Sequence, residues 1–218
     1  PYGTIEFNKI FIKGAKEVNF LGTLIVEEAI IDSNGIDTIN KLSFRRIIAK
    51  KLEYKTTNGI ISFHDYGSDQ TVTIGNLWLY GNIRADFRGA SKVTSLETDK
   101  GRCQINIYND FKADIVNLNL NLDRKKEIVD SENQGYFGIH IKNNGNHEVI
   151  IDRLLAQLTE LSISGSVKLG KVLCVPIDSK YNLIQIDARY FGKISIEGFF
   201  VGNDYEIVIN KTTGQISL

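Results

Sequence analysis

The sequence predicts an all-β protein made of many short strands. Three observations carry this prediction: apolar and polar residues alternate in short runs, turns rich in Gly and Asn separate the runs, and apolar strand centres recur at intervals of about 17 to 24 residues. The 218 residues are 42% hydrophobic and 24% charged, as is ordinary for a globular protein. Such a chain can bury one continuous core, so we expect a single solenoid-like domain over residues 1–218.

Alternation is clearest at residues 116–122, where aliphatic side chains and asparagines take turns. Because successive side chains of a strand point to opposite faces, we expect Leu118 and Leu120 in the core and the asparagines between and beside them outside. Similar runs predict further strands at residues 4–13, 72–80, 104–108, 138–142, 148–152, 162–169, 183–187, 193–199 and 205–210.

Two segments fit more than one structure. Residues 152–161 form either a short helix capped by Asp152 or two strand segments joined by a bend, and the pattern favours neither. The helical alternative would place four leucines on one face: Leu154, Leu155, Leu158 and Leu161. Residues 37–53 are open in the same way, because their apolar residues fit both a helical face and a strand face.

The recurring strand centres predict a solenoid. They are Leu24, Leu42, Ile60, Leu77, Leu96, Ile115, Ile139, Ile163, Ile184 and Ile207. Their spacing matches one coil of a parallel β-helix, in which each coil stacks its aliphatic residues on the next. The alternative is a β-sandwich built from hairpins, with a turn about every 8–12 residues.

The chain resembles the right-handed parallel β-helix proteins, which include pectate-lyase-like enzymes, phage tailspikes and some bacterial surface proteins and toxins. The resemblance rests on Asn-Gly turns such as Asn58-Gly59 and on short strands: Ile10-Phe11-Ile12, Leu118-Asn119-Leu120, Ile139-His140-Ile141 and Ile194-Ser195-Ile196. It implies a right-handed parallel β-helix and a place outside the cell, on a cell surface or on a virion. Since the sequence starts at Pro1 and contains no Met, we expect it to be part of a longer chain.

Composition argues against several classes of partner. The 26 basic and 26 acidic residues give a formal net charge of zero, which does not favour binding to nucleic acid. No apolar run reaches the roughly 18–20 residues that span a bilayer, so we expect no membrane span. The two cysteines, Cys103 and Cys174, show no metal-type spacing, and we expect two buried free thiols rather than a disulfide.

Motifs for cofactors and catalysis are weak. Residues 165–171 fit the first part of a phosphate-binding loop, but Val172 stands where Ser or Thr should hold magnesium, and the chain continues as a strand. His64, His140 and His147 have no His or Cys partner at ligand spacing, so we expect surface histidines and no metal. We therefore expect no cofactor, and a binding protein rather than an enzyme.

Residues 63–88 hold the best candidate site. If Leu77 and Leu79 face the core, Trp78 and Tyr80 form an outward aromatic pair on which a sugar could stack. The predicted site combines this pair with charged residues at its rim: Trp78, Tyr80, Asp65, Arg84, Asp86 and Arg88. The opposite assignment would turn the aromatic pair towards the interior or towards a neighbouring subunit.

These observations favour a binding and structural module of a phage tail fibre or tailspike, or of a bacterial surface protein. Its partner would be a polysaccharide or another cell-surface glycan, and it would act as a homotrimer or beside neighbouring domains. A polysaccharide lyase or glycoside hydrolase on the same scaffold is one alternative, with Asp65 and Asp86 as its paired acids. A protein-interaction domain of a secreted toxin is another.

Overall fold

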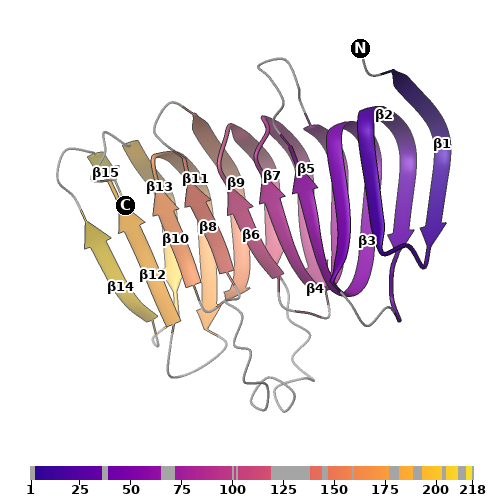
Figure 1. The fold of residues 1–218 in the computed structure, drawn as a ribbon. Helices are drawn as coiled ribbons and strands as arrows, with labels where there is room; N and C mark the ends of the chain where they lie inside the picture. Colours follow the sequence, from indigo (N-terminus) through magenta and orange to yellow (C-terminus); the bar gives the residue numbers. More distant parts are fainter. Residues whose placement is uncertain are drawn as a thin grey trace.

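The computed structural model describes most of the chain as β-strand (Figure 1). The described residues are 3–35, 39–64, 72–99, 101, 103–118, 138–143, 147–158, 160–176, 182–188, 193–202, 205–210 and 215–217. They contain no helix and form a parallel β-solenoid of about seven turns, consistent with a right-handed parallel β-helix. The predicted fold class is therefore confirmed, and every strand pair is parallel, unlike the hairpins of the sandwich alternative.

Fifteen strands lie within the described residues. They are β1 Thr4–Lys13, β2 Glu17–Asp32, β3 Asn40–Phe63, β4 Val72–Phe87, β5 Ser91–Asp99, β6 Cys103–Ile107, β7 Phe111–Leu118, β8 Gly138–Lys142, β9 Glu148–Leu158, β10 Glu160–Ser164, β11 Ser166–Pro176, β12 Asn182–Asp187, β13 Lys193–Val201, β14 Tyr205–Asn210 and β15 Gln215–Ser217.

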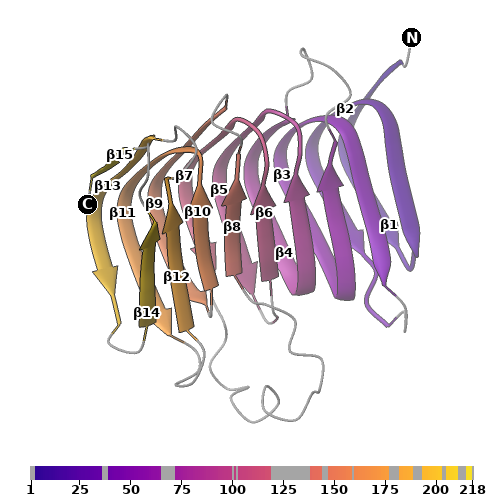
Figure 2. The ribbon, with the colours of Figure 1, turned by 60° about the vertical axis from the view of Figure 1, so that its left-hand side comes forward.

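From β5 onwards, successive strands alternate between two sheets that face each other across the core, whereas β1 to β4 each pair with the next strand in the chain (Figure 2). In sheet 1, the first half of β4 pairs with β5 and is followed by β7, β9, β11, β13 and β15. In sheet 2, the second half of β4 pairs with β6 and is followed by β8, β10, β12 and β14. Strand β4 changes sheets at Gly81, whose φ of 108° is a conformation that other residues rarely adopt.

The core consists of inward residues stacked from one turn to the next. In sheet 1, Leu77, Leu96 and Val116 lie in register, and in sheet 2 the corresponding ladder runs through Ala85, Ile105 and Ile139; all of these are buried. At one corner, aromatic rings continue the stacking over five residues: Phe20, Phe44, Phe63, Phe87 and Phe111. Each turn therefore buries its apolar face on the turns beside it, which is why a solenoid is stable only as a stack.

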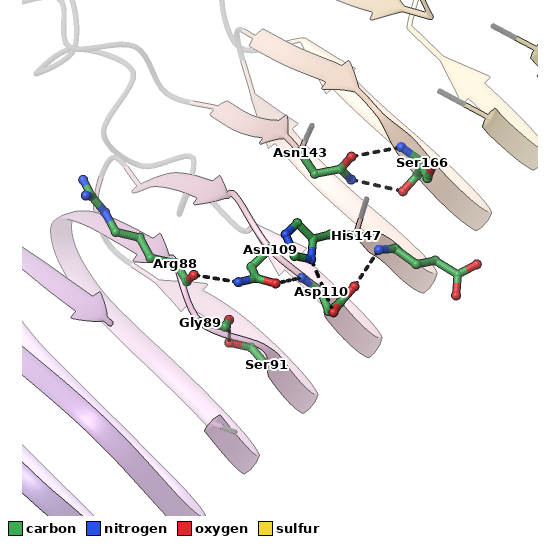
Figure 3. Close-up of polar contacts among 9 residues, drawn as sticks. Arg88, Gly89, Ser91, Asn109, Asp110, Asn143, His147 and Ser166 are labelled. Carbon is green, nitrogen blue, oxygen red and sulfur yellow. Dashed lines mark hydrogen bonds and ion pairs between the residues drawn. The ribbon is translucent and has the colours of Figure 1, made fainter. Parts of the chain in front are cut away.

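Polar side chains join the turns at the corner between sheet 2 and sheet 1 (Figure 3). Asp110 accepts a hydrogen bond from the backbone N–H of Glu148 at 2.7 Å, and its other carboxylate oxygen lies 3.5 Å from Nδ1 of His147. One turn further, Asn143 donates to the carbonyl of Ser166 and accepts from its N–H. These contacts satisfy backbone groups that leave the strands at the corner, so they have a structural role.

The structure decides the segments that the sequence left open. Residues 148–158 and 160–164 are strands, with Leu154 buried and Leu155 exposed, so the alternative of two strand segments is confirmed. The ambiguous segment at 37–53 is strand from Asn40 onwards. The prediction of one strand over 162–169 is wrong, because Gly165 turns the chain from sheet 2 to sheet 1 with a φ of 96°.

The structure also describes both cysteines, the segment that resembles a phosphate-binding loop and part of the asparagine-rich strand. Cys103 and Cys174 are buried free thiols, as expected, and burial raises the pKa of each to about 12. The segment that resembles a phosphate-binding loop lies on the extended strand β11, as the continuing strand pattern predicted. Leu118 is in the core and Asn117 is half-buried on the outer side. Leu120 and the asparagines on either side of it lie outside the described residues.

Candidate functional site

Trp78 and Tyr80 lie on the outer surface of sheet 1. Leu77 and Leu79 are fully buried, whereas both aromatic side chains are half-buried, so the predicted orientation is confirmed. The two rings stack on each other, with centroids 6.0 Å apart and planes inclined by 21°. They form a small aromatic surface that we call the platform.

Charged residues of the neighbouring strands flank the platform. Register places Trp78 between Glu53 of β3 and Glu97 of β5, and it places Tyr80 between Lys55 and Asp99 of the same two strands. On a parallel sheet such neighbours lie about 4.8 Å apart along the hydrogen-bonding direction, close enough for side chains to touch. The platform is therefore framed by three carboxylates and one ammonium group.

The β3 side of the platform is electrically balanced. Glu53 is 7% exposed and forms ion pairs with Lys51 at 2.5 Å and with Lys55 at 3.0 Å. Burial alone would raise the pKa of Glu53, but the hydrogen bonds from the two lysines outweigh it and hold the pKa below its usual value. The Nζ atom of Lys55 also lies 5.2 Å from the ring centroid of Tyr80, within the range of a cation–π contact.

The carboxylates on the β5 side of the platform have different partners from Glu53 on the β3 side. Glu97 accepts a hydrogen bond from the hydroxyl of Ser95 at 2.8 Å. Within the part of the chain that the structure describes, neither Glu97 nor Asp99 forms an ion pair with Lys or Arg. Burial, followed by the carboxylate of Glu53, raises the pKa of Tyr80, so this phenol stays neutral at physiological pH. The platform can offer aromatic faces, a phenol hydroxyl and two carboxylates that have no basic partner among the described residues.

The predicted rim residues lie on the other sheet. Arg84 and Asp86 follow the bend at Gly81 and belong to the sheet 2 side of β4, and Arg88 comes directly after the last residue of that strand. Arg84 Nε donates to Asp86 at 2.9 Å, and Arg88 lies 4.0 Å from the other carboxylate oxygen. The structure thus brings these three together and separates them from the platform. Asp65 lies outside the described residues, so its distance from Asp86 is not defined.

Sheet 2 also carries a buried polar row that was not predicted. Asp86, Asn106 and His140 occupy successive turns in register, and all three are 5% exposed or less. Asn106 donates to Asp86 at 2.7 Å. The expectation of a surface position for His140 is wrong, although it does lie on the outer side of its strand. The Ile139-His140-Ile141 alternation predicts that His140 lies on the outer side of its strand, but it cannot predict whether other side chains cover that outer side.

His140 is the least satisfied member of this row. Its Nδ1 atom lies 3.6 Å from the carboxylate of Glu160, and neither ring nitrogen has a hydrogen-bond partner. Burial lowers the pKa of His140, and the carboxylate of Glu160 acts in the opposite direction. Burial also lowers the pKa of the half-buried His64, with a second contribution from Arg88. A neutral imidazole beside a carboxylate is thus the resting state of His140 at neutral pH.

A shallow groove lies on sheet 1, across its N-terminal turns. Its lining includes Glu6, Ile25, Lys50, Thr73 and Lys92, and it contains none of the predicted site residues. Lys50 and Glu27 form an ion pair within it. The groove is therefore separate from the platform.

The described residues contain no cluster of three or more His, Cys, Asp or Glu side chains that could hold a metal ion. No helix that is long and apolar enough to cross a membrane occurs among the described residues. In comparisons with protein-family models, with curated proteins and with solved structures, nothing matches this chain.

Proposed function

We propose that the protein is a binding and structural module of a surface fibre, such as a phage tailspike or a bacterial surface protein, and that it recognises a polysaccharide on the platform. The observation that carries this proposal is the outward, stacked pair of Trp78 and Tyr80 on the rigid wall of the solenoid. Aromatic faces stack on the C–H groups of a sugar ring, while the neighbouring polar groups bind its hydroxyls.

The scaffold supports this use in two ways. Strands on both sides fix the backbone of the platform through a continuous ladder of parallel pairs, and sites on strands hold their side chains more firmly than sites on loops. Acceptors already lie beside the rings, since Glu97 and Asp99 are the register neighbours of Trp78 and Tyr80. A sugar that stacks on Trp78 would meet both kinds of group at once.

An apolar stripe on the same sheet fits a place within a larger assembly. Leu155, Leu173 and Phe200 continue the outer row of Trp78 over three successive turns and are 38%, 44% and 65% exposed. Aligned apolar side chains of this kind are common at contacts between proteins. We propose that sister chains of a homotrimer or neighbouring domains of the fibre cover this stripe, outside the cell or on a virion.

The test compares Trp78→Ala with Tyr108→Ala. Tyr108 is a matched aromatic residue that lies under Arg88 beside sheet 2, with 5.6 Å from the guanidinium to the ring centroid. Both variants and the parent are screened against immobilised neutral, acidic and amino polysaccharides, and any binding is then measured by calorimetry. Trp78→Ala should weaken binding by about fivefold or more, since stacking of a planar ligand on an aromatic side chain is worth about 1–3 kcal/mol in nucleobase complexes, while Tyr108→Ala should bind like the parent.

The stability of Trp78→Ala should stay within about 1 kcal/mol of the parent, because the side chain lies on the surface. Equal binding by Trp78→Ala and the parent would contradict the platform as the binding site. A parent protein that binds no polysaccharide of the panel would contradict the proposed function.

A further inference from the structure

The charge around the platform is uneven. On the β3 side, the carboxylate of Glu53 is balanced by Lys51 and Lys55. On the β5 side, Glu97 and Asp99 have no basic partner among the described residues, and one of them is the register neighbour of each ring. Within the described part of the chain, two negative charges therefore remain next to the aromatic pair.

The two arginines that were expected to attract an acidic sugar do not lie on this surface. Arg84 and Arg88 were expected at the rim, where their guanidinium groups would bind a sugar acid. The structure places Arg84 on the sheet 2 side of β4 and Arg88 directly after that strand, and Asp86 lies within 4.0 Å of each. A carboxylate or sulfate group on a ligand bound to the platform would lie close to Glu97 and Asp99 instead, and these like charges would repel one another.

We infer that the platform selects polysaccharides with free amino groups, such as chains of unacetylated glucosamine. This inference rests on the proposed function. A protonated amine is attracted to the face of Trp78, the best of the aromatic residues for a cation, and it can donate charge-assisted hydrogen bonds to Glu97. Lys55 already shows this type of contact on the adjacent ring, since its ammonium group lies 5.2 Å from the centroid of Tyr80.

Three features act together in this selection. The aromatic pair supplies stacking for any sugar, Glu97 and Asp99 favour a positive charge on the ligand, and Glu53 is kept from the ligand by its two lysines. Removing the free carboxylates should therefore reduce the preference for amino sugars while leaving the stacking intact. Removing Trp78 should reduce binding of every sugar.

The experiment measures binding of three oligosaccharides of equal length by calorimetry at pH 5.5 and low salt. They are a glucosamine oligomer, the same oligomer in N-acetylated form and an oligogalacturonate. The parent should bind the glucosamine oligomer at least tenfold more tightly than the acetylated one, and the oligogalacturonate least. The double variant Glu97→Gln/Asp99→Asn should bind both glucosamine forms about equally.

The matched control is Glu197→Gln. Glu197 is an exposed carboxylate on the same sheet, paired with Lys168 at 3.6 Å and several turns away from the platform, so its variant should keep the parent's preference. Equal affinity of the parent for the amino and acetylated oligomers, or a preference for the acidic one, would overturn the inference. If that binding still requires Trp78, the proposed function stands; if none of the three binds and the wider panel fails as well, the proposed function falls with it.

Discussion

Before Gly81, strand β4 presents Trp78 and Tyr80 on sheet 1; after Gly81, it presents Arg84 and Asp86 on sheet 2. The two halves are close in sequence and both carry polar or aromatic residues on their outer side. On sheet 2 the charges pair with one another, and Asp86 is 4% exposed. On sheet 1 the half-buried rings lie beside Glu97 and Asp99, which form no ion pair with the basic residues that the structure describes. Adjacent motifs on one strand can therefore serve binding and stability separately, because the bend directs them to different surfaces.

The bend at Gly81 is what directs the two halves of β4 to different sheets. A Cβ atom at Gly81 would lie 1.7 Å from the carbonyl oxygen of Thr56, and its φ is positive, so a side chain is excluded by both overlap and backbone strain. Gly81→Val should lower the free energy of unfolding by about 3 kcal/mol or more, measured by urea denaturation. Gly14→Ala is the control, since Gly14 also has a positive φ but no atom within 4 Å, and it should cost about 1 kcal/mol. Equal costs would show that the close approach at Gly81 is unimportant.

The second test compares a carboxylate on sheet 2, Asp86, with one on sheet 1, Asp99. Asp86→Asn should destabilise the protein by about 2–3 kcal/mol, because it removes a buried charge on which Arg84 and Asn106 depend. Asp99→Asn should change the stability by less than about 0.5 kcal/mol, as is usual for a substitution at a partly exposed surface position. Chemical denaturation of the two variants measures both values. A larger loss for Asp99→Asn would reverse the assignment of binding to sheet 1 and stability to sheet 2.

The third and smallest effect concerns pH. Burial holds the pKa of His140 below its usual value of 6.5, so the unfolded chain takes up a proton before the folded one as the pH falls. The stability contribution of the neutral imidazole is therefore fully present above about pH 6.5 and is lost as the pH falls through the lowered pKa of the folded state. Glu160 and Lys142 are the charged groups that act on this imidazole.

Thermal unfolding of His140→Gln between pH 7.5 and pH 5 tests this effect. The variant should lose less stability than the parent over this range, because glutamine does not titrate. His64→Gln should give a smaller change of the same sign, since burial lowers the pKa of His64 as well but this side chain is only half-buried. Parallel curves for His140→Gln and the parent would show that the buried row does not contribute to the pH dependence.

Local patterns in the sequence determined most of the strands and which of their side chains share a face. Leu77 and Trp78 point to opposite faces because successive side chains of a strand alternate, and the burial of Leu77 in the structure decided which face is the core. The spacing of apolar strand centres likewise predicted the solenoid, since each turn must stack its apolar face on the next. The burial of Cys103 and Cys174 followed from the same pattern.

Only the tertiary structure decided which outer residues meet. Register joins residues from different turns, such as Glu53 and Trp78 or Asn106 and His140, and it depends on the number of residues in each corner. The corners vary in length: β6 ends at Ile107 and β7 begins at Phe111, whereas β7 ends at Leu118 and β8 begins at Gly138. Alternation is a property of one strand, but register is a property of the stack, and no local pattern encodes it. For this reason the sequence identified the platform, while the structure supplied its carboxylates and removed its arginines.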